Sequence, residues 1–64
     1  MLDSNQIKVS SGDFVLNKHR SDYPIGIIEK IEDGCNPICW VDFKQTISNK
    51  KHLTICCQSD IIKQ

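Results

Sequence analysis

Four cysteines and two histidines are the residues of this 64-residue chain whose types could do chemistry. Cys35 and Cys39 lie four positions apart and Cys56 and Cys57 are adjacent, and four thiolates can bind zinc tetrahedrally. Neighbouring residues on a strand point to opposite faces, however, so Cys56 and Cys57 cannot easily reach one ion. We therefore expect no metal site.

The same cysteines have a simpler interpretation as small residues of β-strands. Cys39 and Cys57 are predicted to lie in the core and Cys56 to be a surface thiol. His52 stands four residues before Cys56, but so short a chain leaves little room for a substrate cleft beside a Cys–His pair. The start of the chain, MLDSNQ, lacks the features of a signal peptide, which favours reduced thiols. We predict no catalytic residue, no cofactor and an intracellular, cytoplasmic location.

Basic residues gather at two places in the chain, in Lys18-His19-Arg20 ahead of Tyr23 and in Lys50-Lys51-His52 ahead of the predicted fourth strand. Basic groups neutralise phosphates and an aromatic ring stacks on a base, whereas aromatic anchors with a charged rim also dock proteins. Trp40 stands between Cys39 and Val41, which alternation assigns to the core, so its indole is predicted to face outward toward a partner or a covering loop. The candidate partner-binding residues are Lys18, His19, Arg20, Tyr23, Trp40, Lys50, Lys51 and His52.

The overall composition narrows the class of protein. Eight basic and eight acidic residues cancel, so any affinity for nucleic acid must come from local clusters. The apolar runs are too short to span a membrane, and we expect no membrane insertion. With 64 residues there is room for one domain, over 1–64, of which residues 1–6 are predicted to form a loose tail.

Short β-strands must position these residues. Turn residues recur at short spacing between β-branched runs, and ICWVDF and HLTIC alternate with a period of two. A β-bulge near Glu29 and Lys30 would put Ile28 and Ile31 on one face, and Ser59 is predicted to cap a helical turn, after which Ile61 or Ile62 can close the core. The predicted core is Val15, Ile28, Ile31, Val41, Phe43, Leu53, Ile55 and Ile62.

Four short motifs resemble the SH3-like barrel, and in particular its Tudor and KOW branches. The resemblance implies an all-β fold, a five-stranded SH3-like barrel with a short 3₁₀ or helical turn near the C-terminus. The motifs that carry it are Gly12-Asp-Phe-Val15, Tyr23-Pro-Ile-Gly26-Ile-Ile28-Glu-Lys-Ile31, Trp40-Val-Asp-Phe43 and Ser59-Asp-Ile61.

Each branch implies a different partner. The Tudor likeness implies an aromatic cage for methylated lysine or arginine at His19, Tyr23 and Phe43. The KOW likeness implies that the first loop, NKHRSDYPIG, faces DNA, RNA or a transcription complex. The chain also resembles small barrel subunits on the rim of photosynthetic and respiratory complexes.

The favoured interpretation is a non-catalytic module that docks a protein partner through the first loop and the outer face of the third strand, within a larger assembly. Nucleic-acid binding is the alternative, and the oligomeric state stays open.

Overall fold

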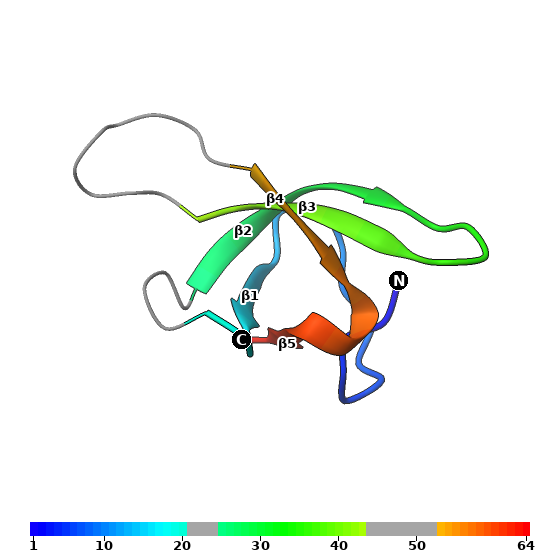
Figure 1. Ribbon diagram of the computed structural model, residues 1–64, viewed down its shortest axis with the longest axis horizontal. Helices are drawn as coiled ribbons and strands as arrows, with labels where there is room; N and C mark the ends of the chain where they lie inside the picture. The colour runs from blue at the N-terminus through cyan, green and yellow to red at the C-terminus, as the bar shows by residue number, and fades with distance from the viewer. Residues whose placement is uncertain (21–24, 44–52) are drawn as a thin grey trace.

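Five antiparallel strands form one sheet in the computed structural model, which describes residues 1–20, 25–43 and 53–64. The strand order is β4-β3-β2-β1-β5, and the sheet is not closed (Figure 1). No helix in the described ranges is long and apolar enough to cross a membrane. The elements are β1 (Phe14–Asn17), β2 (Ile25–Glu32), β3 (Ile38–Asp42), β4 (Leu53–Cys57), the 3₁₀ helix η1 (Gln58–Asp60) and β5 (Ile61–Lys63). The predicted all-β class is confirmed.

The longest strand, β2, bends where the sequence predicts a bulge. Its register against β3 shifts between Ile28 and Lys30. Because one extra residue lies on β2 at this point, Ile28 is buried and Ile31 packs against the same core. The bend allows β2 to pair with β1 at one end and with β3 along most of its length.

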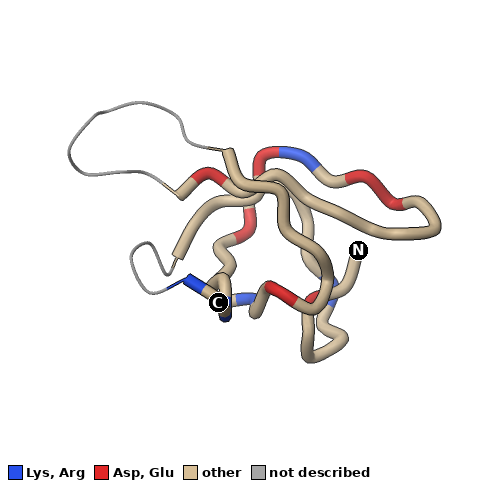
Figure 2. The backbone as a smooth tube through the Cα atoms, in the orientation of Figure 1, with Lys and Arg blue, Asp and Glu red and all other residues tan. Residues whose placement is uncertain are grey.

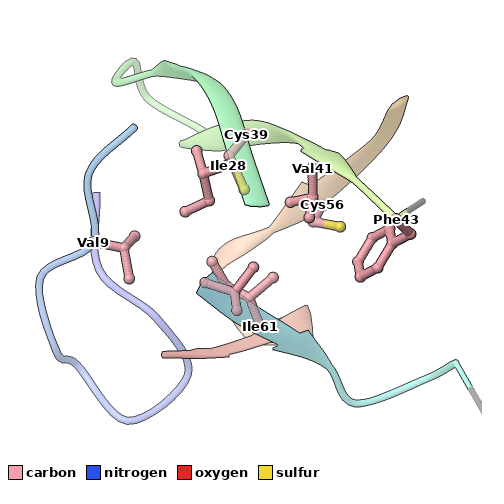
Figure 3. Close-up of a cluster of buried hydrophobic side chains, with 8 residues drawn as sticks. Val9, Ile28, Cys39, Val41, Phe43, Cys56 and Ile61 are labelled. Atoms are coloured by element: carbon pink, nitrogen blue, oxygen red, sulfur yellow. The ribbon is translucent and has the colours of Figure 1, made fainter. Parts of the chain in front are cut away.

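The core is a small cluster in the curve of the sheet, and the figure shows its side chains converging from several strands (Figure 3). Val15, Ile28, Val41 and Phe43 were predicted to be there and are fully or almost fully buried. Among the residues that the structure describes, the buried cluster consists of Val9, Val15, Ile28, Cys39, Val41, Phe43, Cys56 and Ile61.

The predicted orientation of β4 is wrong. Leu53 and Ile55 were assigned to the core, yet they are 46% and 58% exposed, and Cys56 is buried while Cys57 is exposed. The cause is the pairing with β3, in which Cys56 lies directly opposite the buried Cys39. Residues directly opposite on antiparallel strands share a face, so β4 turns its two most apolar side chains outward.

The C-terminal segment also differs in detail from its prediction. The Cys57 N–H donates to the Asp60 carboxylate at 2.9 Å, so the 3₁₀ turn is held by an aspartate rather than by Ser59. Ile61, not Ile62, is the fully buried residue that closes the core. The turn then leads directly into β5, which pairs with β1.

Residues 1–6, predicted to form a loose tail, instead make hydrogen bonds to β5. The Asp3 carboxylate is buried and accepts hydrogen bonds from the backbone N–H groups of Asn5, Ile7 and Lys63, at 2.8–2.9 Å. The Ser4 N–H donates to the Ile61 carbonyl at 2.9 Å. The N-terminal segment therefore covers the outer edge of β5.

Candidate partner-binding surfaces

The convex side of the sheet carries a set of apolar side chains that alternate with the buried ones. Phe14 and Ile25 are each more than half exposed, and Leu53 and Ile55 are exposed to a similar degree. We call this surface the outer face. Its members are Phe14, Leu16, Ile25, Ile27, Trp40, Leu53 and Ile55.

Trp40 lies in the middle of one row of the outer face. It is only partly buried, between the buried Cys39 and Val41, so its predicted outward direction is confirmed. Lys30 is its neighbour on β2 and Ile55 its neighbour on β4. The Lys30 ammonium lies 5.0 Å from the centroid of the Trp40 ring, a cation–π contact that covers part of the indole.

A second row crosses four of the five strands, from Phe14 on β1 through Ile27 and Asp42 to Leu53 on β4. A shallow hollow of about 160 Å³ lies beside Phe14, with Ile25, Ile27 and Asp42 among its lining. Sequence reasoning missed these residues. The available signal was that β1 and the first half of β2 are apolar on both faces, while a single small core can cover only one face of each strand.

The first basic triplet, Lys18-His19-Arg20, lies in the turn after β1. The side chains of His19 and Arg20 contact other described residues. His19 Nε2 lies 3.3 Å from an Asp60 carboxylate oxygen. The Arg20 guanidinium donates to the Thr54 hydroxyl at 2.9 Å and lies 5.2 Å from the centroid of the Phe43 ring. Lys18 is exposed at the start of the turn.

The structure does not bring the predicted site residues together on one face. Arg20 reaches Thr54 and the buried Phe43 on the core side of β3 and β4, whereas Trp40 lies on the outer face. Phe43 is fully buried with Arg20 over its ring, a placement that does not suit an open cage for a methylated ammonium. Tyr23, Lys50, Lys51 and His52 lie outside the described residues.

The four cysteines are all free thiols in two environments. Burial raises the pKa of Cys39 to about 12, and burial also raises the pKa of Cys56, against the opposing effect of a hydrogen bond from the Asn17 amide. Within the described ranges, no three His, Cys, Asp or Glu side chains are grouped so that they could hold a metal ion.

Exposed Cys57 borders a broad surface hollow of about 570 Å³, which Lys18, Gln58 and Ser59 also line. Among the described residues of this hollow there is no histidine or carboxylate that could act as a general base. The described lining can bind polar groups through amides and hydroxyls.

Charged residues are distributed unevenly along the described chain, with most acidic ones along the β2–β3 hairpin and several basic ones near the C-terminus (Figure 2).

Comparison with protein-family models, with curated proteins and with solved structures finds no match for this chain.

Proposed function

We propose that this chain is a non-catalytic binding module with an SH3-like sheet, which docks a protein partner within a larger assembly through the outer face. The observation that carries the proposal is the exposure of Phe14, Ile25, Leu53 and Ile55 on one side of the sheet. Four half-exposed side chains of on the order of 200 Å² each present on the order of 400 Å² of apolar surface. A patch of this size is as large as the largest apolar patch of most monomeric proteins, and such patches are often functional.

The SH3-like part of the proposal is supported by the order of the elements. Consecutive antiparallel strands from β1 to β4 are followed by a 3₁₀ turn and by β5, which returns to pair with β1. This arrangement is similar to the one that the sequence motifs imply. The bulge in β2 supplies the bend that such a small curved sheet needs.

The surface of the partner protein that contacts the outer face is apolar, with lysine or arginine residues at its rim. The β2–β3 hairpin that holds Trp40 carries four acidic residues, Glu29, Glu32, Asp33 and Asp42, against one basic residue, Lys30. The hairpin's formal charge of −3 attracts a basic rim and repels phosphates. Aromatic and aliphatic anchors would supply the affinity and the charged rim the orientation.

The nucleic-acid alternative has less support from the described residues. It would use the two basic loops, of which the one with Lys50, Lys51 and His52 lies outside the described residues. In the other loop His19 faces Asp60, and the Arg20 guanidinium contacts Thr54 and Phe43. Lys18 is exposed, and among the described side chains no acidic group lies within salt-bridge distance of it. It is the one residue of this turn that meets both conditions. A single free lysine supports few phosphate contacts.

Affinity capture with matched variants tests the proposal. We expect a protein retained by the wild-type chain and by Lys18→Glu to be lost with the double variant Phe14→Ser/Ile25→Ser, because only the double variant changes the outer face. Amide NMR spectra confirm that each variant is folded. The purified partner, added to labelled chain, is then expected to shift amides of β1 and β2.

Two results would contradict the proposal. One is equal retention of the captured protein by the double variant. The other is an oligonucleotide titration in which amides of residues 18–20 shift at low salt and return as salt rises, which is the behaviour of a phosphate-binding surface.

A further inference from the structure

The sheet has two edges, and the described residues cover only one of them. At the β5 edge, the Lys63 N–H donates to the Asp3 carboxylate and the Ile61 carbonyl accepts from the Ser4 N–H. At the β4 edge, the only backbone contacts away from β3 among the described residues are local. The Cys57 N–H donates to the Asp60 carboxylate in the following turn.

The backbone of β4 therefore has hydrogen-bonding groups directed at the uncovered edge. The Cys57 N–H bonds to the following turn, so it points away from β3. Alternate residues of an antiparallel strand direct their N–H and C=O groups to the same side, which places those of Leu53 and Ile55 on the uncovered edge as well. Both residues also have exposed side chains, so a second strand can reach them.

The composition of β4 does not protect this edge. Its sequence, Leu-Thr-Ile-Cys-Cys, has no charged residue, no proline and no glycine. Its pairing with β3 runs through all five residues without a register shift. Sheet edges that must stay unpaired usually carry a lysine, a proline or a bulge, and β4 has none of these devices.

We propose that two copies of this chain associate by antiparallel pairing of their β4 strands. The inference goes beyond the proposed function because it concerns the edge of the sheet and a second copy of the chain. Pairing about a two-fold axis at Ile55 places Ile55 opposite its own copy and Leu53 opposite Cys57. Every pair on the outer face is then apolar and no like charges meet.

A second copy fits this edge better than a longer chain of copies. The formal net charge of the protein is zero, so two copies do not repel each other at long range. Because Asp3 and Ser4 cover the β5 edge, β4 of one copy cannot pair with β5 of the next. The remaining edge-to-edge contact uses the same patch on both copies, which gives a closed dimer.

The small contact predicts a weak dimer. Two five-residue strands and two half-exposed side chains per copy bury less than the roughly 1,200 Å² of a stable interface. Dissociation constants of such contacts fall in the range of about 10 μM to 1 mM. Concentration must therefore be varied over this range in the experiment.

Sedimentation equilibrium of the wild-type chain and two matched variants tests the association. The wild-type mass is expected to rise from monomer toward dimer between about 10 μM and 1 mM. Ile55→Lys is expected to remain monomeric, because a lysine on each copy would meet at the two-fold axis. Ile7→Lys, at a residue that is 48% exposed in the N-terminal segment, is expected to behave as the wild type. A wild-type monomer throughout, a mass beyond dimer, or loss of dimer in Ile7→Lys would overturn the proposal.

Disulfide trapping tests the register. In a Cys35→Ser/Cys57→Ser background, Ile55→Cys is expected to form a linked dimer with oxidised glutathione, because directly opposite Cα atoms lie about 5.5 Å apart, within disulfide range. Leu53→Cys in the same background is expected to stay unlinked, because its copy lies four residues, about 13 Å, away. With Cys57 restored, Leu53→Cys is expected to link. The opposite pattern would overturn the proposed pairing.

Discussion

Cys39 and Cys56 lie directly opposite each other on β3 and β4, and both thiols are buried in the core. Their burial sets the orientation of β4, because a buried Cys56 forces Ile55 and Cys57 outward on the same strand. The pair therefore determines which face of the molecule is core and which is available to a partner.

The thiols provide a direct chemical test of this orientation. We expect an alkylating agent at pH 8 to modify Cys35 and Cys57 rapidly and to leave Cys39 and Cys56 unmodified in the folded chain. Burial raises the pKa of both unreactive thiols, that of Cys39 to about 12, so the nucleophilic thiolate is scarce as well as inaccessible. Mass spectrometry would show two adducts on the folded chain and four in denaturant. Labelling of Cys56 ahead of Cys57 would contradict the structure.

Two isoleucines of the same size offer a matched test of the core. Ile61→Ala is expected to lower the free energy of unfolding by about 2–5 kcal/mol, because its side chain is fully buried. Ile55→Ala is expected to cost less than about 1 kcal/mol, because its side chain is 58% exposed. Urea denaturation at low protein concentration measures both. Equal losses would restore the sequence-based assignment of Ile55 to the core.

The difference between predicted and observed core has a physical origin. The orientation of β3 was predictable because Cys39, Val41 and Phe43 alternate with a tryptophan and an aspartate. In β4 one face carries Leu53 and Ile55, and the other carries Thr54 and Cys56. Because leucine and isoleucine are more apolar than threonine and cysteine, hydrophobicity alone assigns the wrong face to the core. The correct face follows from pairing with β3, which is a tertiary contact that periodicity does not contain.

Much of the candidate site could not be predicted from the sequence pattern either, because it also depends on tertiary contacts. Trp40 was predictable from its two buried neighbours. The separation of Arg20 from Trp40 was not, because it depends on a long-range hydrogen bond from Arg20 to Thr54. The ordering of the N-terminal segment depends on one carboxylate, Asp3, which bonds to backbone groups that carry no sequence signal.

The approach of β2 to β3 requires a residue without a side chain at position 26. A Cβ on Gly26 would lie 2.6 Å from Val41 Cγ1 and 2.8 Å from Phe43 Cδ1 and from the Asp42 carbonyl oxygen. Gly26→Ala is therefore expected to lower the free energy of unfolding by about 1–3 kcal/mol, through overpacking of the core and displacement of backbone.

Gly34 is the matched control for this substitution. It lies in the β2–β3 turn, and a Cβ there would meet no atom within 4 Å. Gly34→Ala is expected to change the free energy of unfolding by less than about 0.5 kcal/mol, as for other open surface positions. Denaturant titration of both variants measures the contrast, and a Gly26→Ala protein as stable as Gly34→Ala would show that β2 and β3 do not approach so closely.

Asp3 predicts how stability depends on pH. Burial by itself raises the pKa of this carboxyl, but backbone N–H donors of Lys63, Ile7 and Asn5, together with the charge of Lys63, outweigh it and hold the pKa below its ordinary value of 3.8. The unfolded chain therefore binds the proton at higher pH than the folded chain does. The contribution of Asp3 to stability is complete above the ordinary pKa and is lost as pH falls through the lowered pKa of the folded state.

The variant Asp3→Asn isolates this contribution. It removes the charge and aims an amide N–H₂ at one of the backbone donors, so we expect a loss of about 1–3 kcal/mol at pH 7. Because the asparagine does not titrate, the gap between variant and wild type is expected to narrow as pH falls from neutral to below 3.8, where the wild type loses the contribution of its carboxylate. Glu32→Gln, at an exposed carboxylate, controls for the change in net charge. Urea denaturation of the three proteins across this pH range measures the effect, and a gap that stays constant would show that the Asp3 carboxylate does not join the N-terminal segment to β5.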